Sequence, residues 1–483
     1  MSKIKRFFAN KVFLYLITRY ITFFLQFAVS LYIAIKLGPF YFGIWGFLLL
    51  LINYFQIINL GIPYSATILL VQHKQEEERV ANYEKSSFVM VLILDCIILL
   101  LALYYYFFGI VAFEKYEIGS LFYLVCIIAM ISHFNYLFTS IYRVKKRLFE
   151  VAFFQTSITA LVFITMFFAE KELLLSMLLI AYIVAHVLSL FLFIRGKQVN
   201  IKGKLTLHDI KIVFNKGIML FIYNFCFFMI VLSTRTIVSV YYTVDQFGLF
   251  TFSYTLTHAV ILLLEAFSYL IFPRVIDKLH SKDVSEVKGT IQSLRSNYIS
   301  LSHGLMYVAM ICFPIFLYFI PSFKDSLLMI NLMALTLLLY ANSFGYNSFL
   351  MARNKEKTVA FNAFMVLTVN IGIALLLVLL FKVSFEYVIL ATMFSYFVYA
   401  YLCVYFGKKE LQQKTDFFAV MRECFPFRLF IPFLVAIAVV LMENSFLLFI
   451  PFVVFVFLNL QTIKEIYVSF KRVLSNPDIV DVQ

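Results

Sequence analysis

Four ionisable side chains lie inside long apolar runs of this sequence: Arg19, Asp95, Arg235 and Glu265. A charge in hydrocarbon is costly, so such residues usually face a hydrated interior or a partner and mark functional sites. Guanidinium groups bind anions through several fixed N–H donors, whereas a carboxyl group in a poorly hydrated site can take up or release a cation. These residue types therefore predict the binding and release of charged species, with H+ or Na+ as the candidate coupling ion.

Neutral polar residues accompany these charges along four expected helical faces. Spacings of three, four, seven or eleven residues return to nearly the same side of a helix, because each residue turns it by about 100°. A polar stripe on a helix in hydrocarbon predicts an interior cavity, and we expect the four stripes to line one cavity together. The stripe residues are Arg19 and Gln26 in the first apolar run, Asn53, Gln56 and Asn59 in the second, Asn224 and Arg235 in the seventh, and His258 and Glu265 in the eighth.

Each charged residue also has a purely structural interpretation. Arg19 and Arg235 lie about 10 Å from the end of their runs, so their long side chains could reach the lipid headgroups. Glu265 could form an ion pair that only fixes helix packing. Asp95 is flanked by leucines and has no polar stripe around it, which favours a hydrogen bond to a neighbouring helix and makes Glu265 the better ion-coupling candidate.

The composition places these residues in a membrane protein. Of the 483 residues, 63% are hydrophobic and only 14% are charged, whereas about a quarter of a soluble domain is charged. The apolar runs are about twenty residues long, the length that a helix needs to cross about 30 Å of hydrocarbon. They predict an all-α integral membrane protein, because helices satisfy their own backbone in lipid. The six cysteines are scattered without CxxC pairs, so no metal or cofactor is expected.

Charge clusters, glycines and prolines divide the chain into fourteen predicted transmembrane helices. Three prolines, Pro426, Pro432 and Pro451, interrupt the last two. The expected ranges are 12–35, 43–68, 86–112, 118–142, 150–169, 173–194, 214–241, 247–272, 296–320, 327–351, 358–381, 385–406, 427–442 and 446–463.

Lysine and arginine residues determine the predicted orientation. Cytoplasmic loops collect positive charge, and with a cytoplasmic N-terminus the predicted inside segments hold 33 of the 40 Lys and Arg residues. We therefore expect both termini in the cytoplasm. The net charge of +14 is then a topology signal that requires no nucleic-acid partner. The predicted loops are too short for a folded domain, so the function must lie within the membrane.

The sequence contains a weak internal repeat. Residues 33–72 are echoed by 238–277, and Phe42-Gly43 falls on Phe247-Gly248 at an offset of 205. Two halves of six spans each are typical of transporters built from structural repeats, with the substrate site between them. The repeat predicts an N-lobe of residues 1–205, a C-lobe of 206–407, and a segment of 408–483 that adds spans 13 and 14 and a cytoplasmic tail.

Four motifs lie in the repeated segments: LGPFYFGIWGF at 37–47, INLGIP at 58–63, QFGLFTFSYTL at 246–256 and FPR at 272–274. They resemble the polysaccharide exporter family, of the O-antigen flippase type, in the multidrug/oligosaccharidyl-lipid/polysaccharide (MOP) exporter superfamily. The family's Asp-Arg pair in the seventh span is Thr234-Arg235 here, which argues against Asp-based ion coupling at that position.

The resemblance implies two six-helix lobes around a cavity that opens alternately to each face. It implies outward movement of an undecaprenyl-pyrophosphate-linked oligosaccharide across the bacterial cytoplasmic membrane, for O-antigen, lipopolysaccharide or capsule synthesis. Arg19 and Arg235 would then bind the pyrophosphate, and the stripe amides would bind sugar hydroxyls. The implied partners are the lipid-linked glycan, membrane lipids and a polysaccharide polymerase or assembly machinery.

Two other functions would require different features in the sequence. A polytopic glycan polymerase or glycosyltransferase would need a sizeable outer loop or paired acids, and the outer loops carry only isolated acids such as Asp245 and Glu386. A small-molecule antiporter of the same superfamily would use Glu265 for ion exchange and an aromatic cavity for cationic drugs. Cavity charge separates the two, because a pyrophosphate flippase requires net positive charge and a cation exporter requires carboxylates. The sequence has no GxxxxGK[ST] phosphate-binding loop for ATP-driven transport.

Overall fold

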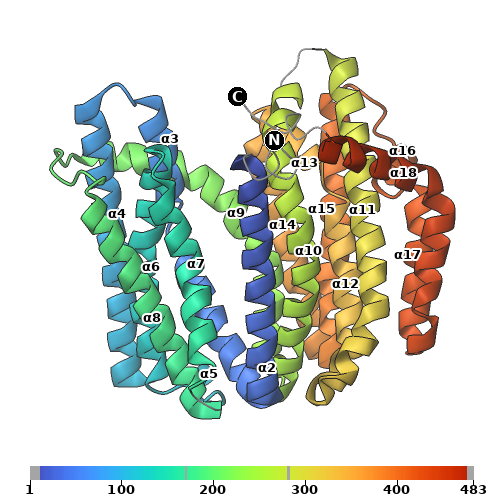
Figure 1. Ribbon diagram of the computed structural model, residues 1–483, viewed down its shortest axis with the longest axis horizontal. Coiled ribbons are helices and arrows are strands. Elements are labelled where there is room, and N and C mark those ends of the chain that lie inside the picture. The colour runs from blue at the N-terminus through green and yellow to red at the C-terminus, as the bar shows by residue number, and fades with distance from the viewer. Residues whose placement is uncertain (1–10, 169–170, 280–282, 476–483) are drawn as a thin grey trace. The chain divides into compact units, whose positions relative to one another are not determined.

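The computed structural model describes residues 11–168, 171–279 and 283–475, and the side chains of residues 11–19, 111–112, 148, 219–220, 263–278 and 469–475 lie outside this description. The described segments fold into helices and turns without β-strands. The long helices of each unit run side by side (Figure 1). The helices are α2 (Lys11–Ile57), α3 (Ile62–Gln72), α4 (Glu77–Phe108), α5 (Val111–Glu114), α6 (Leu121–Val144), α7 (Leu148–Thr165), α8 (Lys171–Gly196), α9 (Leu207–Tyr241), α10 (Val244–Leu279), α11 (Val284–Tyr318), α12 (Leu327–Ala341), α13 (Tyr346–Ala352), α14 (Glu356–Leu375), α15 (Ile389–Glu410), α16 (Phe417–Cys424), α17 (Phe427–Leu441) and α18 (Phe449–Ser475).

The all-α membrane fold predicted from the apolar runs is confirmed. Every predicted span overlaps a helix. In the described part of the chain, ten helices are long and apolar enough to cross a membrane, or up to eleven if α16 and α17, which are bent by 73°, form one span. The number of fourteen spans and the cytoplasmic position of both termini stay predictions.

Two glycine turns shape the first half of the chain, each inside a motif of the repeat. Gly38 interrupts α2 with a φ of 70°, and Pro39 begins the helix that continues to Ile57. Gly61 adopts a φ of 72° ahead of α3, and its N–H donates to the Asn59 side chain at 2.9 Å. A left-handed conformation has little cost for glycine, so both motifs encode chain breaks.

One compact unit comprises Val29–Phe228 and Ser239–Gly248. Within it, α6 packs against α3, α4 and α8, and α7 packs against α8. Its core includes Leu94, Leu137 and Ile141, all buried. These apolar side chains come from helices that are distant in sequence, so the unit is held together by helix-to-helix packing.

A second compact unit comprises the described residues of Met1–Ala28, Met229–Val238 and Leu249–Gln483. Its centre is α12, whose residues from Met329 to Leu339 are all buried. This helix packs against α11, α15 and α17, while α18 packs against α11 and α17. The predicted division into 1–205, 206–407 and 408–483 stays a prediction.

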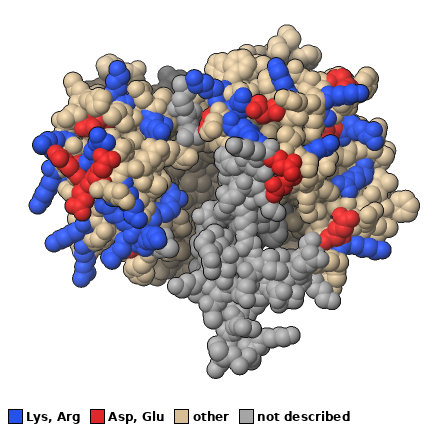
Figure 2. Space-filling model, turned by 90° about the horizontal axis from the view of Figure 1, so that it is seen from above, with Lys and Arg blue, Asp and Glu red and all other residues tan. Residues whose placement is uncertain are grey.

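The exposed surface matches a protein surrounded by lipid. Large apolar side chains are widely exposed, and Phe24, Phe108 and Phe319 each leave more than 70% of their surface uncovered. Figure 2 shows one end of the molecule, where Lys and Arg side chains outnumber Asp and Glu. An apolar belt with charges gathered at an end is the pattern that a bilayer selects.

Candidate functional site

The buried guanidinium of Arg235 lies on an aromatic ring. Arg235 is in α9 and is 5% exposed, and its Cζ lies 4.8 Å from the centre of the Tyr254 ring in α10. The Tyr254 ring stacks on His258 at 5.3 Å with an interplanar angle of 11°. A cation over an aromatic face is stabilised by the ring quadrupole, more strongly where water is excluded. The structure thus brings two of the predicted site residues, Arg235 and His258, to one cluster.

Neutral hydrogen bonds hold the α9 backbone beside Arg235. The hydroxyl oxygens of Thr234 and Thr392 lie 2.8 Å apart, linking α9 to α15. The Asn370 amide of α14 donates to the Ile230 carbonyl at 2.8 Å and to the hydroxyls of Ser233 and Thr234 at 3.0 Å. Thr234, at the position of the Asp in the Asp-Arg pair, therefore holds α9 against α14 and α15. The charged group of this segment is the Arg235 guanidinium.

A second buried cluster joins Asp95 and His133. Asp95 Oδ1 and His133 Nδ1 are 2.8 Å apart, and His133 Nε2 lies 2.8 Å from the Phe55 carbonyl oxygen. Helix α2 ends at Ile57, so the Phe55 carbonyl is near the helix end and can accept a further bond. The interhelical hydrogen bond expected for Asp95 is confirmed, and it links α4 to α6.

The amides predicted on the second apolar run are partly buried in α2 and the turn that follows it. Asn53, Gln56 and Asn59 all lie in the Val29–Phe228 unit. Both ends of the Asn59 side chain serve the turn: its amide donates to the Gln56 carbonyl at 2.8 Å and its oxygen accepts from Gly61. Asn59 thus has a local structural role that its spacing alone did not reveal.

The other predicted site residues fall in different surroundings. Asn224 in α9 is exposed, and Gln26 in α2 is partly buried. The side chains of Arg19 and Glu265 lie outside the described residues. The single cavity predicted from the four stripes stays a prediction.

Two residues of these clusters were not selected from the sequence. Tyr254 precedes His258 by one helical turn, so the spacing alone places both residues on the same side of the helix. The sequence gives no local signal for His133, because its partner Asp95 is 38 residues away and belongs to another helix. The spacing of polar residues therefore did not predict the aromatic partners of buried charges or their partners on distant helices.

The family model described as "Polysaccharide biosynthesis protein" matches residues 8–279, more than half of the chain. The chain belongs to this family. No curated protein sequence matches it. The resemblance drawn from the Phe-Gly and INLGIP motifs is thereby confirmed.

Solved structures with the same fold are membrane transporters and flippases. An inward-facing MATE family transporter of the MOP superfamily superimposes with a TM-score of 0.65 at 12% identity, covering 81% of this chain and 94% of its own. Lipid II flippase MurJ, in an inward closed conformation, gives 0.64 at 14% identity, covering 96% and 99%. A MOP superfamily transporter from Pyrococcus furiosus with a binding pocket of reverse polarity gives 0.54 at 14%, covering 82% and 95%.

At these identities the structural similarity shows the fold. This member of the polysaccharide biosynthesis family therefore has the multi-helical fold of the MATE transporter and of the lipid II flippase. Its structural neighbours are transporters and flippases rather than enzymes.

Proposed function

We propose that this protein is a flippase that moves an undecaprenyl-pyrophosphate-linked oligosaccharide from the cytoplasmic to the outer leaflet of the bacterial cytoplasmic membrane. The observation that carries the proposal is the match to the polysaccharide biosynthesis family over residues 8–279. The substrate has a charged pyrophosphate, a polar glycan and a lipid tail. Alternating access of a hydrated interior lets the polar part cross while the tail stays in lipid.

The cluster around Arg235 supports an anionic substrate. A guanidinium presents a planar fork of N–H donors that matches phosphate oxygens, and it keeps its charge when buried. The Tyr254 ring beside it supplies a flat face and holds Arg235 in place at 4.8 Å. We assign Arg235 to pyrophosphate binding, with Arg19 as the second cation and the amides of Gln26, Asn53, Gln56 and Asn224 as sugar ligands.

The Asp95–His133 pair supports coupling to protons. A carbonyl oxygen only accepts, so His133 Nε2, which faces the Phe55 carbonyl, carries a hydrogen. One further proton lies between His133 Nδ1 and the Asp95 carboxyl oxygen, 2.8 Å away. The pair therefore holds one proton more than a neutral imidazole beside an ionised carboxylate. Release of this proton would leave a buried negative charge on the pair, and such a charge favours a change of conformation. We propose Asp95 and Glu265 as the coupling carboxylates.

The decisive experiment reconstitutes the protein into liposomes and measures the appearance of a lipid-linked oligosaccharide in the opposite leaflet. Wild type is compared with Arg235→Ala, Arg235→Lys and Lys382→Ala, the last an exposed cation in a predicted outer loop. We expect Arg235→Ala to lower the rate at least about tenfold, the loss of one charge-assisted contact. Arg235→Lys should fall between, since a lysine keeps the charge but loses the fork.

A small-molecule antiporter is the alternative outcome. If wild type exchanges protons or sodium for small organic cations and moves no glycan lipid, the flippase proposal fails. Equal rates for Arg235→Ala and Lys382→Ala, at matched protein amounts, would remove Arg235 from the substrate site while leaving the transport function intact.

A further inference from the structure

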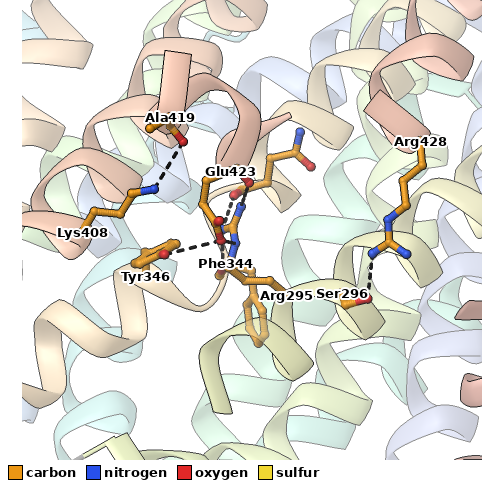
Figure 3. Close-up of polar contacts among 9 residues, drawn as sticks. Arg295, Ser296, Phe344, Tyr346, Lys408, Ala419, Glu423 and Arg428 are labelled. Atoms are coloured by element: carbon orange, nitrogen blue, oxygen red, sulfur yellow. Dashed lines mark hydrogen bonds and ion pairs between the residues drawn. The ribbon is translucent and has the colours of Figure 1, made fainter. Parts of the chain in front are cut away.

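A cationic cavity lies between α11, α15, α16 and α17, within one compact unit. It has a volume of about 510 Å³. Four cations line it against a single carboxylate, that of Glu423. The cations are Arg295 in α11, Lys408 in α15, Arg422 in α16 and Arg428 in α17. Figure 3 shows three of these side chains on three helices, with Lys408 directed at Ala419, Arg295 at Glu423 and Arg428 at Ser296.

Two of these arginines build the frame of the cavity. Arg295 is 4% exposed and donates to the carbonyls of Asn342 and Phe344 at 2.8 Å and to that of Glu423 at 3.0 Å. Its Nε also lies 3.7 Å from Glu423 Oε1, so Arg295 fixes α11 against the α12–α13 turn and α16. Arg428 donates to Ser296 at 2.7 Å, which holds α17 on α11.

Lys408 makes fewer hydrogen bonds than either frame arginine. It is 8% exposed, and in the described part of the chain its ammonium makes one hydrogen bond, to the Ala419 carbonyl at 3.3 Å. An ammonium has three donors. Arg422, which also lines the cavity, is exposed. A nearly buried lysine with spare donors and a neighbouring guanidinium is an arrangement that binds an anion with several oxygens.

The surroundings of the cavity indicate a lipid. Helix α16 is short and precedes α17 with a bend of 73°, and the phenylalanines Phe417, Phe418 and Phe427 at the two helix starts are exposed. From the cavity, Ile431 and Leu434 continue an exposed apolar stripe along α17. A short helix with phenylalanines beside cations is typical of the membrane interface, where headgroup phosphates lie.

We propose that this cavity binds the phosphate headgroup of an anionic phospholipid, with its acyl chains along α17. Lys408 and Arg422 contact the phosphate oxygens, while Arg295 and Arg428 keep the cavity open and positive. The site belongs to one compact unit and does not involve Arg235, so it stands whether or not the transported substrate is a glycan lipid.

The test is lipid binding by the detergent-purified full chain, measured by native mass spectrometry and by thermal unfolding. The probes are phosphatidylglycerol, phosphatidylcholine and inorganic phosphate. We expect Lys408→Gln to weaken phosphatidylglycerol binding about tenfold and Arg422→Gln about threefold, as charge-assisted contacts are lost. The matched control is Lys409→Gln, the exposed neighbour on the same helix, which should bind as wild type does.

The outcomes separate the sources of phosphate. Preference for phosphatidylglycerol, lost in Lys408→Gln and kept in Lys409→Gln, supports the proposal. Equal weakening by both lysine variants would show nonspecific attraction and overturn it. If inorganic phosphate protects wild type as well as the lipid does, the site is a free-anion site and the lipid assignment is wrong. Should Lys408→Gln fail to fold, Arg422→Gln decides the same question, because Arg422 is exposed.

Discussion

Gly43 and Gly248, the glycines of the two repeated Phe-Gly motifs, each pack against the helix of the other. A Cβ on Gly43 would lie 2.1 Å from the Val244 carbonyl oxygen, and a Cβ on Gly248 would lie 2.0 Å from that of Pro39. Pro39 and Val244 are themselves related by the repeat offset of 205. The contact is therefore reciprocal: the repeat has placed α2 and the start of α10 backbone to backbone.

Replacing either glycine with alanine should force these helices apart. A Cβ cannot sit 2 Å from a backbone oxygen, and overpacking of this kind destabilises a protein by about 1–3 kcal/mol. We expect Gly43→Ala and Gly248→Ala to lower the unfolding temperature in detergent and to lower transport. Gly289→Ala is the control, because nothing lies within 4 Å of its added Cβ. A wild-type unfolding temperature in both motif variants would contradict the close contact.

The sequence predicts the repeated motifs and their helices, but not the contact between them. Matching Phe42-Gly43 to Phe247-Gly248 required only local similarity, and each apolar run predicted its own helix, because run length is a local property. That the two glycines touch depends on the packing of distant segments, which the offset does not specify. The same holds for Asp95: its side chain was expected to bond a neighbouring helix, but the identity of His133 follows from the register of α4 on α6.

Tyr254 offers a separate test of the Arg235 cluster. A cation over a ring is worth about 0.5–2 kcal/mol, so Tyr254→Leu should lower glycan-lipid transport by about threefold or more. Tyr254→Phe keeps the ring face and should retain most of the rate. Initial rates in liposomes at equal protein amounts check this, and an equal loss in both variants would assign the effect to the hydroxyl rather than to the ring.

The charged residues of the cationic cavity were counted in the sequence only as topology signals. Lys408 and Arg422 lie in a predicted cytoplasmic segment, and the positive-inside pattern treats every cation there alike. Their convergence with Arg295 depends on the α16–α17 bend, which follows Pro426. The sequence predicts that Pro426 interrupts a helix, but the direction of the bend depends on how the two helices pack against the rest of the unit.

His133→Ala should destabilise the Val29–Phe228 unit strongly. It removes the partner of a buried carboxyl group, and breaking a buried charged pair costs about 3–5 kcal/mol. Asp95→Asn keeps the shape and should be milder, but it should abolish the dependence of transport on a pH gradient. Asn135→Ala, which removes a buried bond to His186 without touching a carboxylate, is the control and should keep that dependence. A pH-gradient response in Asp95→Asn would exclude Asp95 as the proton site.

Glu84 and Lys145 form an ion pair whose carboxylate is buried. The Glu84 side chain is fully buried, Lys145 Nζ lies 2.6 Å from its oxygen, and the Asn200 N–H donates to the same carboxylate. Lys145→Met leaves that charge without its cation and should lower the free energy of unfolding by about 3 kcal/mol. Lys204→Met removes an exposed pair with Glu78 and should change it by less than about 1 kcal/mol. Denaturant titration in detergent measures the free energy of unfolding of both variants. Equal losses of stability would show that the burial of Glu84 does not determine the size of the loss.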